Sequence, residues 1–282
     1  MTQTRNASVR VPGARIHYQV DGSGPVLVVG QSGDGDADRS RDLVAGLTGR
    51  FTVVTWDRRG LSRSVCDDPA APVTMREHAG DLMAVLDEVT DRPVLMLGLS
   101  VGAVLGMHVL RAYPERVACL VAHEPIALRL LEPAAEARAR RDLTAVLETH
   151  RRAGWRAAAG RVAAVLGIDP RGQETEPGIS AFPFDERRAA NFEYFLGRDL
   201  DAALTDDLRA SDLPAGAPIV PAVGERSPAD GFDHRAALAL AGHLGVPAER
   251  FPGGHNGNLT HPRAFAARLL DVLGARSLIV AG

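Results

Sequence analysis

Residues 96 to 104 read MLGLSVGAV, and this stretch decides the interpretation of the whole chain. Ser100 stands between Gly98 and Gly102, after the apolar run 93–97 and before a stretch of helical character. A nucleophilic serine needs a tight strand-to-helix turn that lifts its Oγ clear of the sheet. Side chains two residues away would collide with neighbouring backbone, and glycine removes that bulk. The following helix also points its amino end at the reacting atom, where negative charge is favoured. The stretch therefore predicts a serine nucleophile.

Composition and charge exclude several other classes of function. The 282 residues are 45% hydrophobic and 24% charged, as in ordinary globular proteins. A formal charge of −3 gives no electrostatic reason to expect nucleic acid or a membrane surface as a partner. All 32 basic residues counted as lysine or arginine are arginine, which excludes a lysine Schiff base and a P-loop lysine.

The cysteines and the apolar segments bear on the compartment. Cys66 and Cys119 lie far apart and form no CxxC pair, so neither a disulfide framework nor a thiolate zinc site is indicated. The first ten residues lack the apolar segment of a signal peptide, and no apolar run approaches the ~18 residues of a membrane span. We therefore expect a cytoplasmic protein.

Short β-branched runs alternate with longer helical patterns along the chain, which predicts an α/β fold with a mostly parallel central sheet and helices on both faces. Residues 7–11 and 15–20 predict an edge hairpin, because Pro12 and Gly13 separate them. Buried strands are predicted at 25–30, 51–56, 93–98, 117–122 and 218–223, with a short last strand at 248–253. Helices are predicted at 39–48, 75–90, 101–113, 234–244 and 263–274.

The interval from residue 125 to residue 217 breaks this alternation. It has no strand signal, and it is far longer than a usual strand-to-helix connection. Three stripes of apolar residues at helical spacing begin near residues 143, 155 and 192. We therefore expect an α/β core formed by 1–124 and 218–282, and a helical cap, or lid, formed by 125–217.

The motifs together resemble the α/β-hydrolase superfamily over nearly the whole chain. GLSVG at 98–102 looks like the nucleophile elbow of that family. DRRGLSRS at 57–64 is similar to the turn after the preceding strand, although Leu61 stands where glycine is usual. FPGGHNGNLTHP at 251–262 is similar to the loop that carries the family histidine. The resemblance implies a capped α/β-hydrolase fold in which serine, acid and histidine follow one another along the chain.

A serine nucleophile needs a base at neutral pH, and His255 is the candidate. It follows the last strand signal and two glycines, in a loop that can fold back over the strand ends. His261 beside Pro262 fits the entry to a helix instead. Three further histidines are interpreted as hydrogen-bonded core residues: His17, His108 and His123. With an ordinary pKa near ~6.5, activity should fall as His255 becomes protonated below that pH.

The acid has more than one candidate. By resemblance it would follow the strand 218–223, but Ser227 stands at that position. Some family members instead take the acid from the end of the preceding strand, where this chain has Glu124. A carboxylate there would hold the tautomer of the imidazole and stabilise the imidazolium. We therefore favour Glu124. The other candidates are Asp230 and, after it, Glu225 or Asp233.

An oxyanion hole needs two preorganised backbone donors. The elbow supplies the N–H of Val101. By resemblance, the turn GQSGDG after the strand 25–30 supplies the amide of Ser32, or else that of Gln31. Substrate choice is expected in the cap, whose aromatic residues suggest an apolar acyl or ring system. These residues are Phe182, Phe184, Phe192, Tyr194 and Phe195, with a role in the cap core favoured for Phe192 and Phe195.

The sequence therefore predicts a serine hydrolase that cleaves a carboxylic ester, lactone or thioester of a moderately apolar small molecule through an acyl-enzyme. Neither a metal nor a cofactor is expected, and the expected partner is the small-molecule substrate. Two alternatives stay open. One is an acyltransferase, lyase or cyclase on the same fold, and the other is a ligand-binding receptor without turnover. The sequence predicts no oligomeric state.

Overall fold

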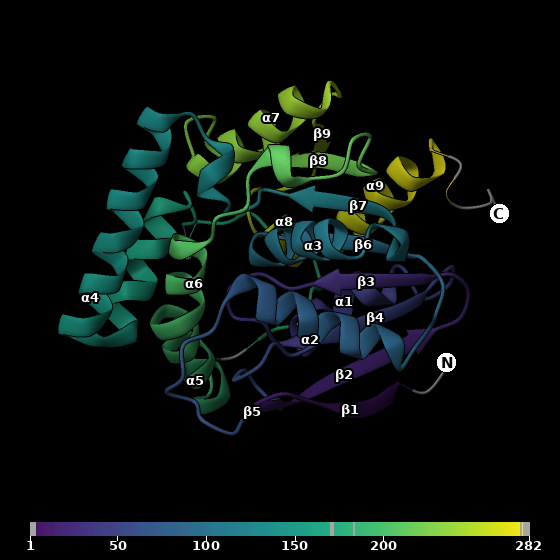
Figure 1. The fold of residues 1–282 in the computed structure, drawn as a ribbon, viewed down its shortest axis with the longest axis horizontal. Helices are drawn as coiled ribbons and strands as arrows, with labels where there is room; N and C mark the ends of the chain where they lie inside the picture. Colours follow the sequence, from purple (N-terminus) through teal and green to yellow (C-terminus); the bar gives the residue numbers. More distant parts are fainter. Residues whose placement is uncertain (1–3, 170–171, 183, 277, 279–282) are drawn as a thin grey trace.

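A computed structural model describes residues 4–169, 172–182, 184–276 and 278. Its centre is a nine-stranded sheet in the order β1-β2-β4-β3-β6-β7-β8-β9, with β5 paired to β2 (Figure 1). The strands from β4 through β9 in that order are parallel, and the β1–β2 hairpin is antiparallel. Their bounds are β1 Arg5–Val11, β2 Ala14–Gly22, β3 Val26–Gly30, β4 Thr52–Trp56, β5 Val65–Cys66, β6 Val94–Leu99, β7 Val117–His123, β8 Ile219–Gly224 and β9 Glu249–Phe251. The predicted fold class is confirmed, and only β5 had no sequence signal.

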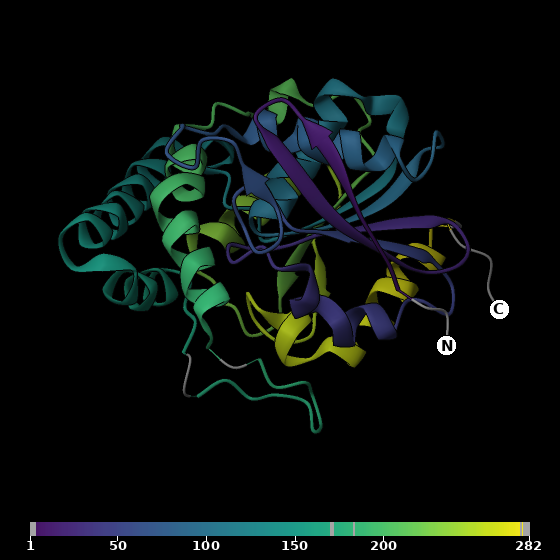
Figure 2. The ribbon, with the colours of Figure 1, turned by 90° about the horizontal axis from the view of Figure 1, so that it is seen from below.

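Helices cover both faces of the sheet (Figure 2). On one face α2 (Met75–Asp87), α3 (Val101–Ala112) and α7 (Phe232–Leu244) bury their apolar sides against the strands. On the other face lie α1 (Arg41–Ala45) and α9 (Pro262–Gly274), with the short α8 (Gly257–Thr260) before α9. Burying both faces explains why the central strands read as continuous apolar runs. None of the described helices has both the length and the apolar character that a bilayer span requires.

Local signals in the sequence begin and end these helices. Thr74 and Glu77 form a reciprocal capping box at the start of α2. Pro262 occupies the first turn of α9, where a missing N–H costs nothing. Gly245, with φ 66°, ends α7 in the left-handed conformation that glycine adopts without strain. The predicted helix ends therefore agree with the observed ones to within a few residues, except that α1 is shorter.

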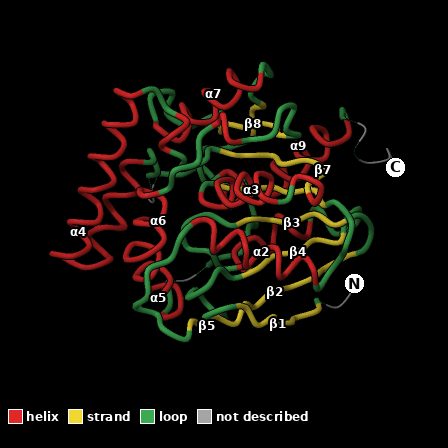
Figure 3. Tube along the Cα trace, in the orientation of Figure 1, coloured by secondary structure: helices red, strands yellow, loops and turns green. Residues whose placement is uncertain are grey.

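Between β7 and β8 the described residues contain helices and no strand, and we call residues 125–217 the inserted segment. It holds α4 (Pro133–Val165), α5 (Glu186–Tyr194), a π-helical turn (Phe195–Asp199) and α6 (Leu200–Thr205). Gly154, with φ 76° and ψ 176°, divides α4 into a longer first part and a shorter second part. Figures 1 and 3 show α4, α5 and α6 beside the end of the sheet toward which β3 and β7 point. These helices occupy the three regions where apolar stripes predicted them.

Candidate active site

Ser100 occupies a strained turn between the end of β6 and the start of α3. Its φ of 56° and ψ of −110° lie in a region that residues with a Cβ rarely adopt. A Cβ added to Gly98 would lie 2.5 Å from Ala103 Cα, and one added to Gly102 would lie 2.2 Å from Gly30 O. Both glycines are therefore needed because backbone approaches them closely. This is the collision that the sequence pattern implied.

Backbone hydrogen bonds tie this turn to the ends of the next two strands. Ser100 N donates to His123 O at 2.9 Å, and Glu124 N donates to Ala222 O at 3.0 Å. Glu124 also has a positive φ of 43°, so the chain turns sharply directly after β7. The carboxyl ends of β6, β7 and β8 thus present their side chains to one region, as the edge of a parallel sheet allows.

The carboxylate of Glu124 is fully buried and hydrogen-bonded on both oxygens. Oε1 accepts from Gly224 N at 2.9 Å. Oε2 accepts from Ser227 Oγ at 2.9 Å and lies 3.2 Å from His255 Nδ1. Ser227, which stands where the family usually has its acid, thus donates a hydrogen bond to an acid from the neighbouring strand. The favoured sequence candidate for the acid meets the favoured candidate for the base.

A second buried carboxylate also lies at His255. Asp233 Oδ2 is 2.6 Å from His255 Nδ1, which is closer than the 3.2 Å between Glu124 Oε2 and the same nitrogen. The two groups form an ion pair without the angles of a hydrogen bond, and Asp233 Oδ2 has no hydrogen-bond partner among the described residues. Sequence reasoning placed Asp233 behind Glu124 and Asp230. Its position in the first turn of α7, the helix that follows β8, was the available signal.

These two carboxylates set the protonation of the imidazole. Burial alone would lower the pKa of His255, but Asp233 and Glu124 outweigh it and raise that pKa to about 10. Burial would likewise raise the pKa of Glu124, yet the imidazole of His234, with Nδ1 3.4 Å from Oε1, and that of His255 hold this pKa well below its ordinary value. Glu124 is therefore an anion, and the ordinary value near ~6.5 does not apply to His255.

The same three side chains have the chemistry of metal ligands, since one donor atom from each of Glu124, Asp233 and His255 lies within 4.8 Å of the others. Tetrahedral zinc with ligands at ~2.1 Å would separate those atoms by about 3.4 Å. His255 Nδ1 instead lies 2.6 Å from one carboxylate and 3.2 Å from the other. Both distances are shorter than the spacing of two ligands on one tetrahedral ion, so these side chains as they stand do not fit tetrahedral zinc.

The other histidine candidates lie elsewhere. His261 precedes Pro262 at the start of α9, as expected of a helix-entry residue. His108 Nε2 lies 2.8 Å from Asp206 Oδ1, which fits a hydrogen-bonded core histidine. His123 is buried between Phe251 and Phe265, and burial lowers its pKa to about 4. The prediction that His123 is hydrogen-bonded is wrong, because neither of its ring nitrogens has a partner among the described residues. The Nε2 atom of His17 likewise has no hydrogen-bond partner there.

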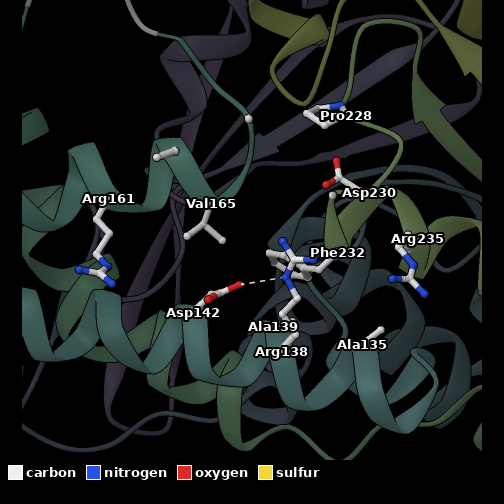
Figure 4. A pocket seen from close by; sticks show the side chains of 13 residues that line it. Ala135, Arg138, Ala139, Asp142, Arg161, Val165, Pro228, Asp230, Phe232 and Arg235 are labelled. Atoms are coloured by element: carbon white, nitrogen blue, oxygen red, sulfur yellow. Dashed lines mark ion pairs between the residues drawn. The ribbon is translucent and has the colours of Figure 1, made fainter.

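The remaining carboxylate candidates are exposed. Glu225 pairs its backbone N–H with Phe251 O, and its side chain lies on the surface. Asp230 is also exposed and lines a groove between α4 and α7 (Figure 4). Arg138 and Asp142, 3.9 Å apart, lie on the α4 side of that groove. Neither Ser100 nor His255 lines it, so this groove is separate from the candidate site.

The predicted oxyanion donors follow the ends of two adjacent strands, β3 and β6. Gly30, at the end of β3, pairs in register with Gly98 on β6, and its carbonyl is the atom that a Cβ on Gly102 would meet. The loop after Gly30, with Gln31 and Ser32, therefore begins beside the serine turn. Val101 is the first residue of α3, so its N–H has no acceptor within the helix. Gln31 is buried, with its side-chain oxygen 2.8 Å from Ser40 Oγ.

Comparison with known proteins shows the family of this chain. A family model described as alpha/beta hydrolase fold matches residues 25–152. YraK of Bacillus subtilis, an uncharacterized hydrolase, is 32% identical over 273 residues that cover 95% of this chain and 96% of the relative. The chain belongs to the α/β-hydrolase superfamily.

Two further relatives of this α/β hydrolase have more specific names. The zearalenone hydrolase of Bionectria ochroleuca is 25% identical over 274 residues, covering 95% of this chain and 97% of the relative. The crystal structure of an enol-lactonase from Burkholderia xenovorans LB400 has a TM-score of 0.70 at 20% identity, covering 95% of this chain and 100% of the other. The second likeness concerns the fold alone.

The five aromatic residues predicted to bind substrate lie in different surroundings within this α/β hydrolase. Phe182 lies under the guanidinium groups of Arg39 and Arg41, at 5.1 and 5.3 Å from its ring centroid. Phe184 and Phe192 stack with Trp155 at centroid distances of 5.0 and 6.1 Å. Phe192 thus packs within the inserted segment, as the favoured interpretation has it.

The other two aromatic residues contact the core of the hydrolase. The Tyr194 ring packs on Gly60, where an added Cβ would approach it to 2.2 Å, and its hydroxyl lies 3.6 Å from Cys66 Sγ. Phe195 is buried with its ring against Gly33, where an added Cβ would lie 2.7 Å from Cζ. Phe195 therefore lies beside the loop expected to donate to an oxyanion. Substrate binding by the five residues stays a prediction.

Proposed function

We propose that this α/β hydrolase is a serine hydrolase that cleaves a carboxylic ester, lactone or thioester through an acyl-enzyme. The observation that carries the proposal is the meeting of Glu124 with His255 at the carboxyl ends of the strands beside the strained turn that bears Ser100. The relative named zearalenone hydrolase, 25% identical over 95% of this chain, supports hydrolysis as the reaction.

Each residue of the proposed site has a chemical role. Ser100 Oγ attacks the carbonyl carbon while His255 Nε2 takes its proton, and Glu124 at Nδ1 holds the required tautomer. The backbone N–H groups of Val101 and Ser32 stabilise the oxyanion. The intermediate then expels the alcohol or thiol, which takes the proton from His255. Water, activated by the same imidazole, hydrolyses the acyl-enzyme and releases the acid.

The inserted segment is proposed to act as a cap that selects the substrate. Its helices lie beside the carboxyl ends of the strands, which is where α/β folds bind ligands (Figure 1). Phe195 brings an apolar ring to the loop after β3. This placement supports an apolar acyl or ring group as the part of the substrate that the cap contacts.

Covalent labelling tests the proposed nucleophile directly. A fluorophosphonate should modify the protein stoichiometrically, and peptide mass spectrometry should find the adduct on Ser100. The Ser100→Ala variant should remain unlabelled at the same reagent concentration. Tight binding of a small ester analogue without labelling would instead favour the receptor alternative, and labelling at another serine would reject the assignment.

The pH dependence of the reaction follows from the raised pKa of His255. The protonated imidazole cannot accept the serine proton, so kcat/KM should rise with pH as His255 loses its proton. Because Asp233 and Glu124 raise this pKa to about 10, the rising limb should lie well above pH ~6.5. Asp233→Asn removes the closer anion and should move the limb toward lower pH, which raises activity at neutral pH.

The measurement is kcat/KM for an activated ester from about pH 5.5 to 10.5, because the pH dependence of kcat/KM reports the pKa of the free enzyme. Asp230→Asn is the matched control, because it makes the same chemical change three residues away on an exposed side chain. Its profile should coincide with that of the wild type. An unshifted limb in the Asp233 variant would show that Asp233 does not act on His255.

A further inference from the structure

The loop that follows β3 is held by its carbonyl groups. Four consecutive carbonyls, of residues 31–34, accept hydrogen bonds from side chains of other segments. The pairs are Arg58 Nη1 with Gln31 O (3.2 Å) and Ser32 O (2.8 Å), Arg58 Nη2 with Gly33 O (2.7 Å), and Asn191 Nδ2 with Asp34 O (3.0 Å). One guanidinium thus fixes three successive peptide groups.

Arg58 is held in turn by the inserted segment. Its Nε and Nη2 donate to Asp199 Oδ2 at 3.0 and 2.8 Å, so all five N–H groups of the guanidinium have an acceptor. Both side chains are buried, at 1% and 0% exposure. Burial would raise the pKa of Asp199, but His78 and Arg58 hold it below the ordinary value, so the pair is charged. The guanidinium therefore has a fixed position and orientation.

Asp199 belongs to a turn that meets the loop after β3 directly through Phe195 and indirectly through Arg58. It ends the π-helical turn Phe195–Asp199, a geometry that occurs often at functional sites. At the start of that turn, the Phe195 ring packs on Gly33. Asp199 Oδ1 also lies 3.0 Å from His78 Nε2 in α2. The turn thus joins the inserted segment, the loop after β3 and the core helix α2 in one buried cluster.

Peptide geometry links this cluster to the proposed reaction. In a trans peptide the C=O of one residue and the N–H of the next point in opposite directions. Because Arg58 binds Gln31 O, the N–H of Ser32 must face away from the guanidinium. Without that contact, rotation of this peptide could turn a carbonyl, which repels an oxyanion, to the position of the donor.

We propose that Arg58, held by Asp199, is a positioning residue that orients the Ser32 amide as an oxyanion donor, so that correct seating of the inserted segment is required for catalysis. The inference rests on the proposed serine hydrolase function and deepens it. It makes the inserted segment part of the catalytic apparatus in addition to its proposed role in substrate choice.

The next residue in the chain provides a matched control. Arg59 Nε and Nη2 bind the two oxygens of Asp81 at 2.6 Å each, and these side chains are 12% and 3% exposed. The pair therefore resembles Arg58–Asp199 in chemistry and is nearly as buried. The only backbone carbonyl that Arg59 contacts in the described residues is Pro12 O, at 3.4 Å.

The test compares two double variants, R58M/D199N and R59M/D81N, in the full chain. Changing both partners avoids leaving a lone buried charge, which would destabilise the fold more than loss of the whole pair. With p-nitrophenyl butyrate as substrate, R58M/D199N should lose about 10- to 100-fold in kcat with KM nearly unchanged, because an oxyanion donor acts mainly in the transition state. R59M/D81N should keep the wild-type kcat at comparable thermal stability.

A tetrahedral boronic acid adduct provides an independent measurement. R58M/D199N should bind an alkyl boronic acid more weakly by the same factor as its loss in kcat, while R59M/D81N should bind it like the wild type. R58K should recover part of the activity, because an ammonium can reach some of the three carbonyls. Equal kcat values for the two double variants, or equal losses in both, would overturn the proposal.

The outcomes also separate this inference from the proposed function. A wild type that shows no Ser100-dependent turnover refutes the function itself. A wild type with such turnover, joined to an unaffected R58M/D199N, refutes only the positioning role. If the double variant does not fold, R58K against R59K gives the comparison, because lysine keeps a positive charge opposite each aspartate while it loses the fork of donors. Equal kcat values in R58K and R59K then overturn the inference.

Discussion

The Ser100→Ala variant is expected to lose kcat by about 10⁴- to 10⁶-fold while it keeps the stability of the wild type. The loss follows because Ser100 Oγ is the atom that forms the acyl-enzyme, and removing a serine nucleophile from its triad eliminates that route. The fold should tolerate the change, because alanine occupies the same positive-φ turn at the same strain cost as serine. The measurement is hydrolysis of an activated ester together with the thermal unfolding midpoint.

Ser64→Ala should give the opposite pattern and serves as the control. Ser64 is 4% exposed against 5% for Ser100, so the two serines are equally buried. Ser64 Oγ donates to Asp57 O at 2.6 Å and accepts from His17 N at 2.8 Å. Its removal should cost about 1–3 kcal/mol of stability because buried polar groups lose their partners, with little change in kcat. Wild-type turnover by Ser100→Ala would end the serine assignment.

The sequence predicts a site residue well where that residue acts through contacts with its near neighbours in the chain. Ser100, Gly98 and Gly102 form a pattern whose cause lies within one turn, so spacing alone could suggest the steric reason that the structure shows. The strands and helices also follow from local periodicity and caps. Glu124 is favoured through the resemblance to family members that take the acid from the end of the strand beside the nucleophile's own strand.

The residues that sequence reasoning placed low or missed act across long separations. Asp233 reaches His255 because α7 begins beside the end of β8, and no spacing rule encodes that approach. Arg58 and Asp199 are 141 residues apart, and only the packing of the inserted segment brings them together. In sequence, Arg58 is one of two adjacent arginines in DRRG, and nothing local distinguishes it from Arg59. Tertiary contacts decide which arginine reaches the loop.

The local argument makes a second strong prediction, for Gly102→Ala. Gly102 lies in the first turn of α3, where alanine would normally be favoured over glycine by up to about 1 kcal/mol. Its Cβ would nevertheless lie 2.2 Å from Gly30 O and 2.4 Å from Gly30 C. These are backbone atoms at the end of β3, so relief requires moving the strand or the helix. We expect a loss of about 3 kcal/mol or more, at the upper end of overpacking effects.

Gly80→Ala makes the same substitution in α2 with the opposite expected sign. Beyond the backbone of α2 itself and the two chain neighbours, no heavy atom of the described residues lies within 4 Å of the added Cβ, so the change should stabilise the protein by about 0.5–1 kcal/mol through helix propensity alone. Denaturant unfolding of both variants against the wild type measures the two effects on one scale. A stable, active Gly102→Ala protein would mean that β3 and α3 do not approach as closely as the serine turn requires. The loop after β3 would then not lie beside Ser100, and both the glycine pattern and the proposed oxyanion donors would lose their physical basis.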